Sequence, residues 1–298
     1  MDSISLSSFD RMQARDVNNF AETIACEVVN KFYIVNAPWA VTALHGLVKA
    51  FMPEKFTRKL SFASGDGLGD TELVKKAGGE EQLKSLYAVR AGLVSKQIHS
   101  VKVYTEMLDT FADKDEQEIV TMLRSRFKDE FAKRKAEGRD YEPFFGDRAL
   151  LRVVRGNNGC LGSAVNWFKR FLKRVEEHKL DSLIEDLTRR LDESGGVFGA
   201  TSMLPYYDEI QEHSRLIFTA PRLSPKGDLV SYLPLGDHNR AGIIANVPWE
   251  HWARHVLGNV VLRSIECDRL SRTQNRLVRF IQIADMDGSG MGVSGLPS

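Results

Sequence analysis

The sequence predicts an α/β protein with a mixed, mostly parallel sheet, covering helices and a helical subdomain. Three observations carry this prediction. A strand–helix–strand unit runs from Lys31 to Phe62, and strand-like segments recur at 229–233 and 279–284. Residues 94–193 between these parts are highly charged and mostly helical in pattern. Two strands joined by a helix imply a parallel pair with a right-handed crossover.

The first part of the chain predicts two helices and two strands. Residues 5–29 place apolar side chains at steps of three to five, the period of an amphipathic helix. The run Phe32–Val35 is β-branched and aromatic, which is typical of a buried strand. Asn36-Ala-Pro38 suits the start of a helix, and residues 39–52 carry an apolar stripe. Residues 56–62 are expected to return as a short strand.

The middle of the chain is polar and mostly helical. After Gly65–Gly69 the chain becomes polar, and the pair Gly78-Gly79 indicates a turn or loop within this polar stretch. The two most helical stretches are 115–135 and 147–191. A flexible tail is expected over 291–298, which is rich in glycine and shows no periodicity.

The last part of the chain returns to strands around a long helix. Segments 216–219 and 229–233 have strand character and are separated by the turn Ser224–Asp228. A long helix is predicted from about Pro248 to Asn275, and it leads into the strand 279–284.

Composition limits the classes of function. The chain has 298 residues, 41 of them basic and 40 acidic, and its net charge of +1 argues against nucleic-acid binding driven by bulk charge. The three cysteines show no metal or disulfide spacing, which favours a reducing compartment. No apolar run approaches the roughly 20 residues of a membrane span, and the first residues carry no signal-peptide pattern. We therefore expect a cytoplasmic protein.

Five separated segments resemble one family. Glu27–Pro38 is similar to the pattern P-E-R-x-x-K-x-x-I-I-N-A-P, and Phe280–Gly288 is similar to V-x-I-x-D-L-x-G. Asp147–Arg155 resembles D-x-x-L-L-R-F-L-R-A-R-K-F, and Ala164–Arg174 resembles its continuation. Lys226–Val230 sits where a D-x-x-G-R-P-V turn is found. These patterns are those of the CRAL-TRIO lipid-binding family, which includes phosphatidylinositol-transfer proteins.

The order of these segments differs from that of the family. The family runs from the helical subdomain through the floor strands and the D-L-x-G strand to the N-A-P strand and its gate helix. Here the N-A-P segment comes first, so the order resembles a circularly permuted CRAL-TRIO fold. The expected parts are a C-terminal-half-like region with the gate helix (1–93), a helical subdomain (94–195), the floor strands (196–290) and the tail. A true permutation, a fragment of a tandem array and an exchange of halves between two chains remain open, and we favour a self-contained monomer.

The resemblance implies a non-catalytic, soluble protein that binds and transfers lipid. One hydrophobic lipid, with phospholipids among the candidates, would lie in an apolar cavity closed by the gate helix. The gate helix would open at a transiently contacted membrane surface. Burial of an acyl chain contributes about 0.8 kcal/mol per CH₂. No other cofactor, no metal and no nucleic-acid partner is expected; the alternative is a regulatory or scaffolding module with a vestigial pocket.

The resemblance also places candidate site residues. The pocket would be lined by Phe32, Ile34, Phe62, Phe218, Tyr232, Ile281 and Ile283. The gate helix would present Val41, Leu44, Leu47, Val48 and Phe51. Glu27 matches the acidic member of an acidic–basic headgroup pair, whereas Val28 replaces the arginine and Gly156-Asn157-Asn158 replaces A-R-K. The pattern therefore does not favour phosphatidylinositol over another phospholipid or a neutral hydrophobe.

Two metal-like patterns have simpler interpretations. Asp285-x-Asp287-x-Ser289-Gly290 matches the first half of a calcium loop, but its twelfth position is Leu296 and not glutamate. A strand that ends in a turn explains the segment better. His251 and His255 are four residues apart on a predicted helix without an evident third ligand, so two polar or half-buried histidines are expected. The sequence also lacks a G-x-S-x-G elbow and a phosphate-binding loop.

Overall fold

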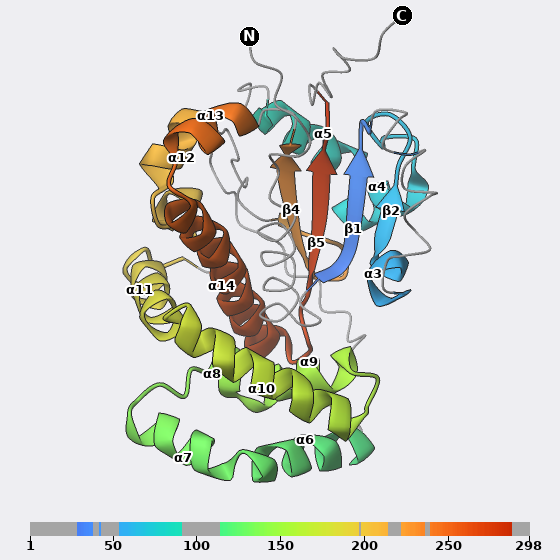
Figure 1. Cartoon of the computed structure of the whole chain (residues 1–298). Helices are drawn as coiled ribbons and strands as arrows, with labels where there is room; N and C mark the ends of the chain where they lie inside the picture. Colours follow the sequence, from blue (N-terminus) through green and yellow to red (C-terminus); the bar gives the residue numbers. More distant parts are fainter. Residues whose placement is uncertain are drawn as a thin grey trace, which may run out of the picture. The chain divides into compact units, whose positions relative to one another are not determined.

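The computed structural model describes residues 29–37, 42, 54–90, 114–196, 198–213, 222–235 and 239–287. These residues belong to two compact units, drawn in Figure 1. The sheet unit contains described residues from 29–90, 207–248 and 280–287, and the helical unit contains those from 114–206 and 249–279. The predicted helix 5–29 lies outside the described residues except for Val29, which begins β1. The strand 216–219, the tail and all of 39–52 except Thr42 also lie outside the described residues.

The sheet unit is built on five strands in the order β2-β1-β5-β4-β3. Their bounds are Val29–Val35 (β1), Leu60–Phe62 (β2), Arg222–Leu223 (β3), Leu229–Pro234 (β4) and Phe280–Asp285 (β5). β5 pairs in parallel with both β1 and β4, β1 pairs in parallel with β2, and only the β3–β4 hairpin is antiparallel. The prediction of a mixed, mostly parallel sheet is confirmed.

The register of the central strands decides which side chains share a face. Tyr33 lies beside Ile283, and Ile283 lies beside Tyr232. One step earlier, Phe32 lies beside Gln282, which lies beside Ser231. Successive side chains of a strand point to opposite faces, so these two rows are on opposite sides of the sheet.

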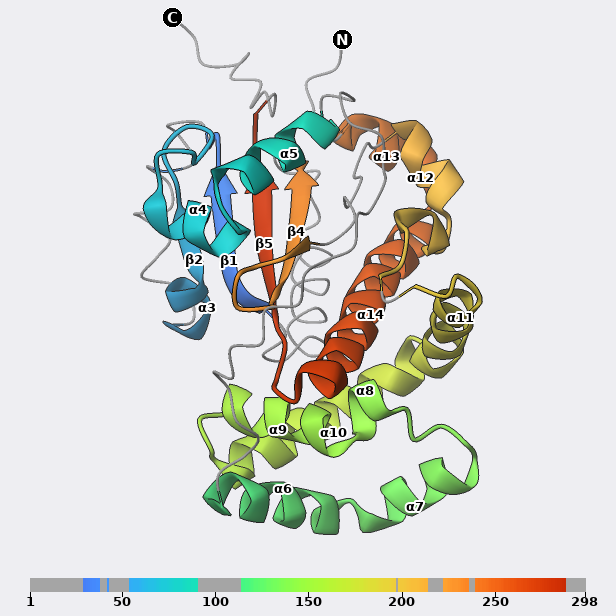
Figure 2. The ribbon, with the colours of Figure 1, turned by 180° about the vertical axis from the view of Figure 1, so that it is seen from behind.

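Two short helices cover one face of the sheet, as Figure 2 shows. They are α4 (Thr71–Ala77) and α5 (Glu80–Arg90). Asp70 caps α4 by accepting a hydrogen bond from the Leu73 N–H, and Gly78 ends α4 with φ of 99°. The cluster between the helices and the sheet contains Tyr33, Val35, Ala63, Leu73, Ala77, Leu83, Leu86, Val230, Tyr232, Ile281 and Ile283.

The segment before β2 differs from the prediction. Residues 56–62 were expected to form a strand, but Glu54–Lys59 form a helix (α3) and only Leu60–Phe62 form β2. The strand part is short because β2 pairs with β1 only from Phe32 to Ile34. The sheet unit also contains α12 (Tyr207–His213) and α13 (Arg240–Asn246).

The helical unit contains seven α-helices within its described residues. These are α6 (Lys114–Arg126), α7 (Lys128–Ala136), α8 (Glu142–Phe145), α9 (Asp147–Gly156), α10 (Leu161–Glu177), α11 (Leu180–Glu193) and α14 (Trp249–Gln274). A short 3-10 helix, η3 (Thr201–Met203), precedes α12. The helical character of 115–135 and 147–191 is confirmed, with a break at Phe127 in the first stretch.

One continuous core holds the helical unit together. It includes Leu123, Phe145, Leu150, Phe168, Phe171 and Leu187, and α14 contributes Leu257, Val261, Leu262 and Ile265. The long helix predicted near 248–275 therefore groups with the helical unit, and the boundary drawn at residue 196 does not coincide with the compact units. Among the described helices, none is long and apolar enough to cross a membrane.

Candidate functional site

The sheet has a second face, opposite α4 and α5, that is largely apolar. Figure 1 shows it toward the viewer. The strand register places on it Leu60 and Phe62 of β2, Phe32 and Ile34 of β1, Phe280 and Ala284 of β5, and Leu229 and Leu233 of β4. We call these residues the open-face row. Phe32, Ile34 and Phe62 are only partly buried, whereas Leu229 and Ala284 are fully buried.

Two polar side chains interrupt this apolar surface at the sheet centre. Ser231 and Gln282 are 1% and 7% exposed. The Gln282 amide lies 3.5 Å from the Ser231 carbonyl oxygen. The Ser231 hydroxyl is buried and finds no hydrogen-bond partner among the residues that the structure describes. The open face therefore combines a broad apolar surface with a small polar centre.

The expected pocket residues divide between the two faces of the sheet. Phe32, Ile34 and Phe62 belong to the open-face row. Tyr232, Ile281 and Ile283 point the other way, into the cluster with α4 and α5. A cavity on one face can be lined by only one of these sets, because residues at odd and even positions of a strand face opposite sides. The predicted pocket set included residues from both faces of the strands, because a single strand does not show which of its faces lines a cavity.

The remaining expected site residues cannot be placed. Phe218, Glu27 and the gate-helix residues Val41, Leu44, Leu47, Val48 and Phe51 lie outside the described residues. Their roles stay predictions.

The carboxyl ends of β1 and β5 are joined by a polar network. Asn36, the first residue of N-A-P, has φ of 51° and donates from Nδ2 to Asp285 Oδ1 at 2.8 Å. Its backbone N–H donates to the Gly65 carbonyl at 2.6 Å. The Met286 N–H donates to the Val35 carbonyl at 3.1 Å. The N-A-P motif after β1 and the family-like motif of β5 therefore meet at the carboxyl ends of these two neighbouring strands.

Asp285 is the centre of this network. It is 1% exposed, and besides Asn36 it accepts from the Tyr232 hydroxyl and from the Asp287 N–H. Several hydrogen bonds satisfy a buried carboxylate, which would otherwise be costly to desolvate. The segment Asp285–Asp287 is therefore the end of a strand and its turn. Within the described residues, no group of three or more acidic, histidine or cysteine side chains could hold a metal ion.

An aromatic pair connects this network to α5. The Tyr87 ring packs edge-on against Tyr232 at 5.5 Å between centroids, and its hydroxyl donates to the Asp66 carbonyl. Burial raises the pKa of Tyr87, and the carboxylates of Asp285 and Asp66 raise it further. Tyr87 therefore stays a neutral hydrogen-bond donor.

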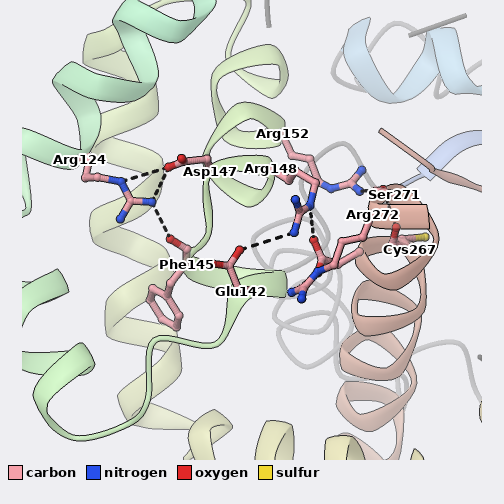
Figure 3. A network of polar contacts seen from close by, with 10 residues as sticks. Arg124, Glu142, Phe145, Asp147, Arg148, Arg152, Cys267, Ser271 and Arg272 are labelled. Carbon is pink, nitrogen blue, oxygen red and sulfur yellow. Dashed lines mark hydrogen bonds and ion pairs between the residues drawn. The ribbon is translucent and has the colours of Figure 1, made fainter. Parts of the chain in front are cut away.

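The family-like opening helix, α9, is held by charges on its neighbours (Figure 3). Asp147 accepts from Arg124 at 2.5 Å, and Arg148 donates to Asp268 of α14 at 2.8 Å. Arg152 is 6% exposed and donates to the Ser271 hydroxyl at 3.1 Å. Burial lowers the pKa of the Arg152 guanidinium.

Ser271 links this helix to Val278, which follows α14 in the chain. Its hydroxyl accepts from Arg152 and from the Val278 N–H at 2.9 Å, and it donates to the Cys267 carbonyl. Asp147 and Arg152, which carry the D-x-x-L-L-R likeness, thus fix α9 within the helical unit. The sequence did not reveal this structural role, because the partners are far away in the chain.

The histidine pair of α14 has ordinary structural partners. His255 is buried, and its Nδ1 lies 2.8 Å from the Pro205 carbonyl oxygen. Burial lowers the pKa of His255, and the hydrogen bond to Pro205 acts in the opposite direction. His251 stacks on Tyr206 with 3.8 Å between ring centroids. His251 is half-buried, as expected, whereas His255 is fully buried.

Together, these features define an α/β protein whose mostly parallel sheet has one face covered by α4 and α5 and a second, largely apolar face. The family model of the CRAL/TRIO domain matches residues 1–87, so this first part of the chain is similar to that family. The matched segment contains β1, β2 and α4. No curated protein and no solved structure matches the chain significantly.

Proposed function

We propose that this protein binds one lipid against the open face of its sheet and transfers it between membranes without catalysing a reaction. The observation that carries the proposal is the open-face row itself, which lies beside the N-A-P turn in the segment that matches the CRAL/TRIO domain model. Phe32, Ile34 and Phe62 are only partly buried on this face. Partly buried large apolar side chains are the surface that an acyl chain needs, at about 0.8 kcal/mol per buried CH₂.

The proposed mechanism needs a cover over the bound lipid. Residues 39–52 directly follow the N-A-P turn, and their apolar stripe includes Leu44, Leu47 and Phe51. In the proposal this segment is the gate helix, which opens at a membrane interface and exposes its stripe there. The Asn36–Asp285 hydrogen bond supports this part because it fixes the turn from which the segment leaves the sheet.

We also propose that the family fold is circularly permuted in this chain. β5 comes last among the described strands, yet it lies between β1 and β4 in one sheet. This arrangement is the one expected if a single chain supplies both halves of the lipid domain. It requires no second copy of the chain.

A pair of substitutions on the two faces tests the binding proposal. We expect Ile34→Trp to reduce uptake of lipid from mixed phospholipid vesicles, because the larger ring occupies the open face. Ile283→Val is the matched control on the helix-covered face, and it should cost about 0.5–1.5 kcal/mol of stability while uptake stays unchanged. The measurement is lipid per protein after separation from the vesicles, with unfolding curves for each variant.

Either of two results would contradict the binding proposal. Equal uptake by Ile34→Trp and by the unaltered protein would remove the open face from the site. No uptake by the unaltered protein from any vesicle would favour the regulatory or scaffolding alternative.

A further inference from the structure

The segment from residue 126 to residue 136, which ends α6 and forms α7, carries an excess of positive charge. It contains five basic and two acidic residues, a net charge of +3, whereas the whole chain has a net charge of +1. We call this segment the basic stretch. Figure 1 and Figure 2 show α6 and α7 along the outer side of the helical unit, away from α14. The charge excess therefore belongs to one outer layer of this unit.

One of the five cations has a structural role inside the helical unit. Arg134 is 5% exposed, and it pairs with Glu130 at 2.9 Å and with Asp181 at 3.0 Å. Its guanidinium also lies over the Phe145 ring, 4.2 Å from the centroid. These contacts neutralise Arg134 and Glu130 within the packing of the helices, so neither residue adds to the charge of the outer surface.

The other four cations are exposed. They are Arg126, Lys128, Lys133 and Lys135. None of their side chains has an ion-pair partner among the residues that the structure describes. Asp129 is the one acidic side chain of the basic stretch that is exposed as well. The outer surface of the stretch therefore keeps a clear positive excess, which an external anionic partner can neutralise.

The lysines lie on both flanks of the outward side of α7. Phe131 stacks on Phe168 of α10 with 5.6 Å between ring centroids, which fixes the side of α7 that faces the core. At 3.6 residues per turn, the small residues Ala132 and Ala136 lie on the outward side, and both are exposed. The same period places Lys133 on one flank of these alanines, and Lys128 and Lys135 on the other. Long side chains in this arrangement can reach one flat surface together.

The character of this surface favours an anionic membrane over a protein partner. Specific protein interfaces are anchored by buried aromatic or arginine side chains in shaped pockets, and the outward side of α7 offers alanines and Asp129 at its centre. A leaflet of anionic lipids needs no such anchor, because each nearby lysine or arginine is attracted by the surface potential. Met122, four residues before Arg126 on α6, is 48% exposed and adds one apolar side chain that suits the headgroup region.

We propose that the basic stretch is a docking surface for membranes that contain anionic phospholipids. The four exposed cations attract the negatively charged leaflet, and α7 lies along it with its alanines toward the headgroups. This contact is electrostatic, so it weakens as the salt concentration rises. The inference goes beyond the proposed lipid site, since it concerns recognition of a membrane surface by the helical unit alone.

The test measures co-sedimentation of the full chain with vesicles of phosphatidylcholine, with and without phosphatidylserine. We expect binding to the vesicles that contain phosphatidylserine and a loss of this binding at high salt. In the double variant Lys133→Gln/Lys135→Gln, binding should fall about 25-fold, since each basic residue near an anionic surface contributes about fivefold. The matched control is Lys75→Gln/Lys76→Gln, which removes the same charge from the last turn of α4, as the first variant does from the last turn of α7. The control should bind as the unaltered protein does.

A variant that gains binding guards against a folding defect in the double variant. Ala132→Lys adds a cation to the outward side of α7 and should strengthen binding about fivefold over Ala132→Gln, with equal unfolding curves for both. The inference is overturned if the unaltered protein binds both kinds of vesicle equally, or if the α7 double variant binds as tightly as the α4 control. Vesicle binding is measured separately from lipid uptake, so failure of this inference is distinct from failure of the proposed function.

Discussion

Asn36 and Asp285 are 249 positions apart in the sequence and form one hydrogen bond. Each belongs to a separate family-like motif, and their contact explains why both motifs need a polar residue there. Asn36 also has a positive φ, which asparagine tolerates better than most residues. The sequence suggested Asn36 as a cap for the following helix. Its partner could not be predicted, because the register between β1 and β5 is a tertiary property.

Two substitutions at this residue separate its side-chain and backbone contributions. Asn36→Gly keeps the positive φ and loses the bond to the buried carboxylate, so we expect a loss of about 1.5–3 kcal/mol of unfolding free energy. Asn36→Ala should cost about 1 kcal/mol more, since alanine is strained at this φ. Chemical denaturation of the three proteins measures both steps. Equal stability of the alanine and glycine variants would show that the backbone conformation is not held in solution.

At the scale of elements, the sequence predicted those whose apolar periodicity is strong. β4, β5 and α14 lie where they were expected, within one or two residues, and β1 begins three residues before the predicted run Phe32–Val35. α4 and α5 were missed, because their surroundings are polar and their fully buried apolar side chains are few, namely Leu73, Ala77, Leu83 and Leu86. Asp70 before α4 and Gly78 after it are helix-capping signals that could have revealed the first helix. The strand register is needed to assign each predicted pocket residue to one face of the sheet. The sequence of a single strand does not reveal that register.

The cap of α4 gives a prediction for this element. Asp70→Ala should lower the stability by about 1 kcal/mol, because the Leu73 N–H loses its acceptor. Lys84→Ala on α5 is the control, and its half-exposed side chain should contribute within about 0.5 kcal/mol. Thermal or urea unfolding of both variants measures the difference. A control variant that is as unstable as Asp70→Ala would contradict a specific role of the cap.

At the scale of the whole molecule, segments from distant parts of the sequence complete each of the two units. β5 completes the sheet begun by β1, and α14 completes the core begun by α6–α11. The CRAL/TRIO match covers only residues 1–87, yet the sheet that this segment enters needs β4 and β5 for its other half. A lipid site on the open face therefore depends on both parts of the chain. This dependence is the central claim of the account.

Native mass spectrometry of the purified full chain tests that claim most directly. The account predicts a monomer that carries one lipid per chain, because a single chain supplies every strand of the open face. A strict dimer would show that the two halves of the sheet find their partners in another copy. A monomer that carries no lipid, and takes none up from mixed vesicles, would contradict the binding function.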